Sequence, residues 1–254
     1  MNKINVVDNK IIPFDNTDVI LNNNIITFTN NGDYYLEYIT SNNVNITISV
    51  EDNVCVHLFE YSNNKDINTN IIYNLGKNSS LIISKFYYND NTNEEINIYL
   101  NKKKANIKYN FSSISKNHDN YLINIYHNDS TTNSDIFNRT IAKENSSNNF
   151  DINSYVENKI LDCYLNQSTK IITLGDSNNK INPNMFTHDN SVTAIHASVI
   201  GNVNEEELFY LMSRGISYNE AIKIIIKGII LSNINPNMEY REKILNILEE
   251  VGGE

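Results

Sequence analysis

A histidine in an apolar strand is the first residue of this chain that could do chemistry. His196 lies in VTAIHASVI, which spans Val192–Ile200. A neutral imidazole can bind a metal ion, but a lone histidine in such a strand is more often a core residue. Its neighbours Ala194 and Ser198 are small enough to leave room for a metal ion or a thiolate of another chain. Both faces of the strand are apolar, so we expect the β core to cover one and helices or a second subunit to cover the other.

Two cysteines are the other candidate ligands for a soft metal. Cys55 and Cys163 are too few for a disulfide framework, which favours a reducing compartment. Free cysteine is among the most buried residue types, so we expect both to be small buried hydrophobes. His57, His118 and His127 have no Cys or His neighbours at metal-binding spacing and are interpreted as incidental.

Composition and motifs exclude several function classes. The chain carries 20 Lys and Arg against 30 Asp and Glu, so it lacks the basic surface of a nucleic-acid-binding protein. It has neither a signal-peptide pattern nor an apolar run of about 18 residues, so we expect a cytoplasmic protein without a membrane segment. The sequence contains no G-x-S-x-G, P-loop, H-E-x-x-H or paired C-x-x-C motif. We therefore do not expect an enzyme.

Short β-strands fill the first 200 residues. They are rich in β-branched and aromatic residues, are bounded by Asn, Asp, Ser or Gly, and are not interrupted by a helix-period segment. This pattern predicts a mainly β fold rather than alternating strands and helices. Local pattern leaves a sandwich, a barrel and a solenoid open, because no clean repeat stands out. The clearest strands are 45–50, 54–59, 81–87, 96–100, 105–111 and 121–126.

Strong helix signals begin after these strands. Asn204 precedes Glu207, and Ser217 precedes Glu220, with the spacing of a capping box that satisfies free N–H groups at a helix start. Gly215 tolerates positive φ and is expected to end the first helix. The sequence therefore predicts two helices joined by a short turn.

A third helix is predicted near the end of the chain. It opens at Asn235 and Pro236 and runs to about Val251 with one apolar stripe. The chain is thus expected to consist of a β core over residues 1–200 and a helical domain over residues 201–254. If the β core is a solenoid, the helices are expected to cover its C-terminal end, because the ends of a stacked fold need covers.

The run HASVIGNVNEEELFYLMSRGISYNEAIKIIIKGI resembles the C-terminal signature of the SufB/SufD family. Members of that family are scaffold subunits of the SUF iron–sulfur assembly machinery. In the family, a strand with His and small residues leads to an LFYL-x-x-RGI helix and then to a helix rich in Ala and Ile. The match is dense from Asn182 to Gly228. The resemblance implies a right-handed parallel β-helix followed by a small α-helical C-terminal domain, in a member shortened at its N-terminus.

Three positions make this chain resemble SufD more closely than SufB. Ser168 stands where SufB-type chains have a cysteine, and Ile195 and Ala197 flank His196 where SufB-type chains have glutamates. Serine is a much poorer ligand than a thiolate for iron or sulfur chemistry. The resemblance therefore implies a SufD-like subunit that does not hold a cluster alone. Whether Cys163 compensates for Ser168 is left open by the residues.

The resemblance also implies partners and site residues. It implies a non-catalytic scaffold that works with a SufC-type ABC ATPase and with a SufB-like chain or a second copy of itself. His196 would be a cluster or iron ligand at the subunit interface, for an iron–sulfur cluster that is transient and shared with the partner. The residues implied to dock the ATPase are Phe209, Tyr210, Arg214, Gly215 and Ile216.

Two other function classes fit a β-rich chain without catalytic motifs. The first is a purely structural β-solenoid used for assembly, which would bind no metal. The second is a polysaccharide-acting β-helix enzyme with grouped acidic residues. Such enzymes are typically exported, and this sequence shows no export signal.

Overall fold

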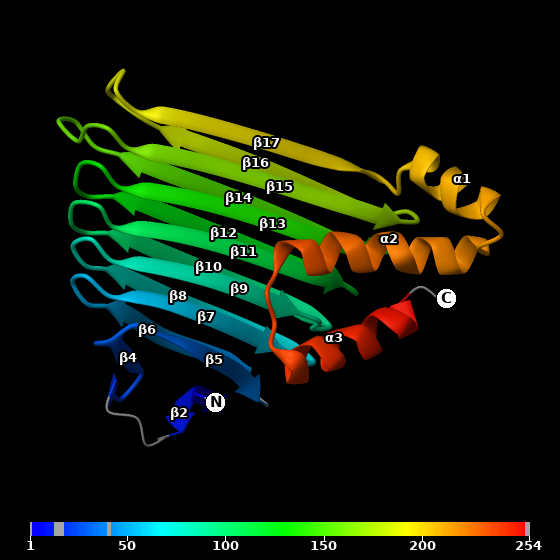
Figure 1. Cartoon of the computed structure of the whole chain (residues 1–254), viewed down its shortest axis with the longest axis horizontal. Helices are drawn as coiled ribbons and strands as arrows, with labels where there is room; N and C mark the ends of the chain where they lie inside the picture. Colours follow the sequence, from blue (N-terminus) through cyan, green and yellow to red (C-terminus); the bar gives the residue numbers. More distant parts are fainter. Residues whose placement is uncertain (1, 13–17, 40–41, 252–254) are drawn as a thin grey trace.

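The strands of this protein form a parallel β-helix with helices on its flank (Figure 1). The computed structural model describes residues 2–12, 18–39 and 42–251. Successive strands alternate between two sheets, and nearly all neighbours within a sheet run parallel. The predicted mainly β solenoid followed by three helices is therefore confirmed.

The bounds of the elements are as follows. The first sheet contains, in pairing order, β17 (Thr193–Asn202), β15 (Tyr164–Leu174), β13 (Asn133–Lys143), β11 (Asn106–Ser115), β9 (Ser80–Tyr87), β7 (Cys55–Ser62), β5 (Gly32–Ile39), β1 (Asn2–Val7) and β2 (Lys10–Ile12). The second contains β16 (Asn178–Phe186), β14 (Ser147–Val156), β12 (His118–His127), β10 (Asn91–Leu100), β8 (Asp66–Leu75), β6 (Asn43–Val50), β4 (Ile25–Phe28) and β3 (Val19–Asn22). The helices are α1 (Glu205–Ser213), α2 (Tyr218–Asn233) and α3 (Met238–Val251).

Turns of unequal length hide the repeat of this solenoid from sequence inspection. One ladder of hydrogen-bonded amides crosses the second sheet through Asn97, Asn124, Asn153 and Asn184. The partners in it are 27, then 29, then 31 residues apart in sequence. The strands stay in register because the extra residues lie in the turns between them. A fixed period, which sequence inspection looks for, is therefore absent.

Helices α2 and α3 pack on the outer face of the first sheet, near the C-terminal ends of its strands (Figure 1). The Tyr240 ring of α3 lies 5.1 Å from the Phe59 ring and 5.3 Å from the Tyr61 ring, centroid to centroid. The amide of Asn233 in α2 donates to the backbone carbonyl of Phe111 at 2.8 Å. On β7 the usual alternation of buried and exposed residues gives way to continuous burial from Leu58 onward, because the helices cover the outer face there.

The expectation that the helices cover the C-terminal end of the solenoid is therefore wrong. They cover its flank because the outward-facing side chains at the ends of β7, β9, β11 and β13 are large and apolar. Burying such side chains stabilises the fold by about 1.5–3 kcal/mol each. The end strand β17 contributes no residue to this buried cluster.

Local signals at the helix ends agree with the structure. The side chain of Asn204 accepts hydrogen bonds from two backbone N–H groups of α1, and that of Ser217 accepts one from α2. Gly215 adopts a φ of 85° in the turn between them. Helix α3 begins at Met238, later than predicted, because Asn237 accepts the hydrogen bond from its first turn. None of the described helices is long and apolar enough to cross a membrane.

Candidate functional site

The C-terminal end of the solenoid is an uncovered strand. Among the described residues, β17 pairs only with β15, and its other edge is open. All but one of its residues are exposed, and Ile195, Val199 and Ile200 are each about half exposed at 47%, 52% and 46%. The expectation that both faces of this strand are covered is wrong for the chain by itself. An exposed apolar strand of this length is a surface on which another chain can pair.

His196 lies on the interior side of this end strand. It pairs with Gln167 of β15, whose side chain is buried between the sheets. Paired residues of parallel strands point to the same side of a sheet, so His196 faces the solenoid interior. It is nevertheless exposed, because no described strand lies beyond β17. No hydrogen bond or ion pair joins it to the described residues, unlike a histidine that is satisfied in a core.

Gln167, which pairs with His196, has a side-chain oxygen without a hydrogen-bond partner among the described residues. The Gln167 amide nitrogen donates to the Ser154 hydroxyl at 2.8 Å and to the Asn184 carbonyl at 3.3 Å. Its carbonyl oxygen is buried and has no hydrogen-bond partner among the described residues. Unpaired buried acceptors are rare and costly. The open end of the interior therefore presents an imidazole and a free acceptor side by side.

Ser168 lies on the opposite face from His196. It pairs with Ala197 and is half-buried on the outer side of β15. Arg139 donates to the Ser168 hydroxyl at 3.2 Å and to its carbonyl at 3.0 Å. The structure therefore does not bring Ser168 and His196 together as ligands of one metal ion within this chain.

The two cysteines differ in environment. Cys163 is buried as predicted, and its sulfur lies 3.3 Å from the Thr132 hydroxyl. Because it is buried in the interior while Ser168 faces out, Cys163 does not take the position of the missing thiolate. Cys55 is exposed at the start of β7, so the expectation that it is buried is wrong. The outer face of β7 is covered by helices only from Phe59 onward.

One histidine that the sequence analysis interpreted as incidental is buried and hydrogen-bonded in the structure. His127 is buried, with its two ring nitrogens 2.8 Å from the Thr132 hydroxyl and 3.0 Å from the Ser134 hydroxyl. Burial lowers the pKa of His127 to about 4. The alternation of β12 places it inside, but only knowledge of the strand's buried face could have shown this.

The described residues of this chain do not form a complete ligand set for a metal ion or a cluster. Within residues 2–12, 18–39 and 42–251, no three His, Cys, Asp or Glu side chains gather in a geometry that could hold a metal. An iron ion requires several ligands. An iron ion bound at His196 would therefore need ligands beyond these side chains.

The implied docking residues lie on an exposed helical surface. Helix α1 buries none of its residues, and Phe209 and Tyr210 are 74% and 57% exposed. The Arg214 guanidinium lies 5.2 Å from the Tyr210 ring centroid, and Ile216 is half-buried. Gly215 supplies the turn. A groove of about 570 Å³ between α1 and α2 is lined mainly by apolar side chains. The residues that line it are Glu206, Glu207, Tyr210, Leu211, Ile224, Ile225, Gly228, Ile229 and Ser232.

Together these features define a parallel β-helix protein with one open end and an exposed helical surface. The profile of the SUF system FeS cluster assembly family, SufBD core domain, matches residues 20–229. The chain therefore belongs to the SufBD core family, and the resemblance inferred from its C-terminal segment is confirmed. Membership implies a role in SUF iron–sulfur cluster assembly.

Curated relatives agree with this assignment. The iron–sulfur cluster assembly protein SufD of Bacillus subtilis (strain 168) is 26% identical over 117 residues, which is 45% of this chain and 27% of the relative. A SufBD family protein of Pyrococcus horikoshii is 54% identical over 35 residues, 14% of this chain and 8% of the relative. One of Galdieria sulphuraria is 44% identical over 46 residues, 18% of this chain and 21% of the relative. The matched segments thus span about a quarter or less of each relative.

Proposed function

We propose that this chain is a SufD-like, non-catalytic scaffold subunit of a cytoplasmic SUF-type iron–sulfur cluster assembly complex. Its partners would be a SufC-type ABC ATPase and a SufB-like chain, or a second copy of itself. The observation that carries the proposal is the open end at β17, an exposed edge strand that presents one metal-binding side chain and pairs on one side only among the described residues. An incomplete ligand set at an open edge suits a site that a partner completes.

The cluster would be cargo that is held transiently at the interface. His196 would supply an imidazole ligand, and the SufB-like partner would supply the thiolate that Ser168 does not provide. The free carbonyl oxygen of Gln167 beside it would accept a hydrogen bond from the second ring nitrogen or from a bound water. Both groups come from the interior side of the last two strands of the first sheet.

The ligand role of His196 is tested with His196→Ala in the complex, co-expressed with the ATPase and the SufB-like chain and purified without oxygen. Iron, acid-labile sulfide and complex size are measured together. We expect loss of iron and sulfide with the complex intact. His118→Ala, at another exposed histidine, is the matched control and should keep both. Normal iron in the His196→Ala complex would refute the ligand role, and loss of the complex would favour a structural one.

The ATPase would dock on α1 and the groove between α1 and α2. Exposed aromatic side chains next to an arginine are typical of the residues that dominate interface affinity. Phe209→Ala with Tyr210→Ala should weaken ATPase binding by about 30-fold or more, as expected for hot-spot residues. Met238→Ala, 81% exposed on α3, is the control and should bind normally. Unchanged ATPase binding by the double variant would contradict docking at α1.

A further inference from the structure

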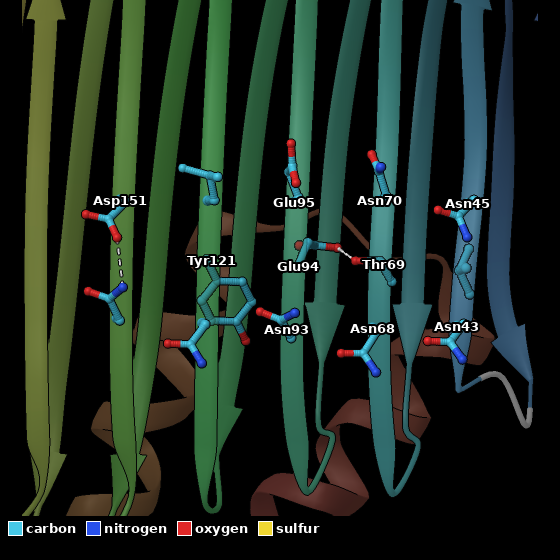
Figure 2. Close-up of a pocket in the computed structure, with 14 residues that line it drawn as sticks. Asn43, Asn45, Asn68, Thr69, Asn70, Asn93, Glu94, Glu95, Tyr121 and Asp151 are labelled. Atoms are coloured by element: carbon cyan, nitrogen blue, oxygen red, sulfur yellow. Dashed lines mark hydrogen bonds between the residues drawn. The ribbon is translucent and has the colours of Figure 1, made fainter.

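A groove crosses the outer face of the second sheet, on the side of the solenoid opposite the helices (Figure 2). Its volume is about 300 Å³, and it runs across β6, β8, β10, β12 and β14. Most of its lining side chains are amides, and no lysine, arginine or histidine is among the described residues that line it. The groove is at the small end of the range for ligand sites, which suits a thin ligand.

Parallel pairing in register arranges the lining residues in two rows (Figure 2). The first row is asparagine on five successive strands, at Asn43, Asn68, Asn93, Asn120 and Asn149. The second row lies two residues further along each strand and consists of Asn45, Asn70, Glu95, Leu122 and Asp151. Neighbouring strands are about 4.8 Å apart, so each row presents one side chain per strand at that spacing.

The first row differs from the amide ladder that runs from Asn97 to Asn184 on the same face. In that ladder each amide donates to the next at 3.0 or 3.1 Å. The exposed side chains of Asn68, Asn93 and Asn120 make no hydrogen bond to other described residues. Each of these amides has a carbonyl acceptor and an NH₂ donor that a ligand can use.

The second row places an apolar side chain between two carboxylates. Glu95 and Asp151 lie two strands apart in one row, a separation of roughly 9.5 Å along the groove. Leu122 is half-buried between them. An elongated ligand with two cationic ends and an apolar middle matches this order of side chains.

Amide side chains orient both carboxylates. The amide nitrogen of Asn97 donates to Glu95 Oε1 at 3.0 Å. Asp151 accepts one hydrogen bond on each oxygen, from Asn149 at 2.8 Å and from Asn182. A carboxylate has about four lone-pair sites, so both keep capacity for a further donor.

We propose that this groove binds a linear polyamine such as spermidine along its second row. Two ammonium groups would pair with Glu95 and Asp151, and the methylene chain between them would lie on Leu122. The free amide oxygens of Asn93 and Asn120 would accept the remaining N–H groups. The net charge of −10 also favours a cationic ligand.

Other ligand classes match the groove less well. Calcium and magnesium bind oxygen ligands at about 2.0–2.6 Å, so such an ion cannot bridge carboxylates two strands apart. A neutral sugar could use the amides but would leave both carboxylates without a cation. The site lies on the sheet opposite the helices and depends neither on His196 nor on the proposed scaffold function.

The experiment is a calorimetric titration of the full chain with spermidine at low ionic strength. We expect one spermidine per chain, with an affinity that falls as salt is added. Putrescine, which has one ammonium fewer and a shorter chain, should bind about fivefold more weakly or worse, the effect of one exposed ion pair. Hexaamminecobalt(III) has the charge of spermidine in a compact ion and should also bind more weakly, because it cannot reach both carboxylates.

Variants of single carboxylates test the position of the ligand. Glu95→Gln and Asp151→Asn should each weaken spermidine binding by about fivefold, and the double variant should weaken it further. Asp66→Asn is the matched control. Asp66 is an exposed carboxylate on β8 of the same sheet, accepts an amide hydrogen bond from Asn91 at 2.7 Å, and does not line the groove. Its variant loses the same charge and should bind spermidine normally.

Three outcomes would overturn the site. The first is the absence of spermidine binding to the wild-type chain at low ionic strength. The second is equal binding of spermidine and hexaamminecobalt(III), which would show attraction of any trivalent cation. The third is an affinity for spermidine that is unchanged in the double variant or reduced equally by Asp66→Asn.

Discussion

The two ends of the solenoid are built differently. At the N-terminal end, each sheet finishes in a short antiparallel strand, of 3 residues in β2 and 4 residues in β3. At the C-terminal end, each sheet finishes in a long parallel strand, of 10 residues in β17 and 9 residues in β16. Short, reversed edges discourage pairing with other chains, whereas long open edges invite it. One end of the solenoid is thus closed by short reversed strands, and the other leaves long strand edges open among the described residues.

The interiors near the two ends also differ. The first rungs bury Ile4, Ile26 and Phe28, which need no hydrogen bonds. The last rungs bury Asn138 and Gln167, and each of these leaves its side-chain oxygen without a partner among the described residues. These apolar side chains of the N-terminal interior therefore need no partner. The C-terminal interior has polar groups that a partner, water or a ligand can satisfy.

A charge placed in the interior at the N-terminal end of the solenoid should have the largest effect on stability. Ile26 of β4 is fully buried and pairs with Ile48 of β6. Ile26→Asp puts an unpaired carboxylate into an apolar core and should lower the free energy of unfolding by about 3–5 kcal/mol. Urea denaturation of the full chain measures this. A loss below about 1 kcal/mol would show that the N-terminal end is not a packed core.

Titration of a buried carboxyl group on β12 should have the next largest effect on stability. Burial raises the pKa of Asp119 on β12 from 3.8 to about 7. The folded chain therefore holds this proton more tightly than the unfolded chain, so the contribution of Asp119 to stability is greatest at low pH. It should fall by an amount on the order of 4 kcal/mol as pH rises from about 4 to about 7. Asp119→Asn should lack this loss when unfolding is measured across that range, and a loss that persists would contradict the assignment.

His127, on the same strand as Asp119, should give stability the opposite dependence on pH. The pKa of His127 is lowered by burial from 6.5 to about 4, so the folded chain resists protonation. Its contribution to stability is complete above about pH 6.5 and falls by about 3 kcal/mol as pH drops to about 4. His127→Gln should remove this loss and leave the opposite slope from Asp119. Wild-type stability should thus vary less between pH 4 and 6.5 than that of either variant.

A charge placed on β17, at the C-terminal end of the solenoid, should have the smallest effect on the stability of the chain alone. Ile200 faces the same interior side as Ile171 but is 46% exposed. Ile200→Asp should change the free energy of unfolding by no more than about 0.5 kcal/mol, as expected for an exposed site. It should nevertheless abolish association with the SufB-like chain, measured by light scattering of the mixed proteins. A stability loss as large as that of Ile26→Asp would erase the distinction between the two ends.

The sequence by itself determined the local elements and the family. Strands such as 45–50 and 121–126 follow from β-branched and aromatic residues between turn-forming residues, a signal contained in a few neighbouring positions. The caps at Asn204 and Ser217 also depend only on residues within one helical turn. The long C-terminal segment was specific enough to indicate the SufBD family without any structure.

Only the tertiary structure decided how these elements meet. The helices lie on the flank because apolar side chains from several distant strands, such as Phe59 and Phe86, form one patch there. The exposure of Cys55, the burial of Lys85 and the interior-facing position of His196 depend on which strand lies next to each and whether anything lies beyond. Neighbours in this fold are about 25–31 residues apart in sequence, with turns of varying length between them. The physical reason is that burial is a property of assembled sheets, and no local pattern contains it.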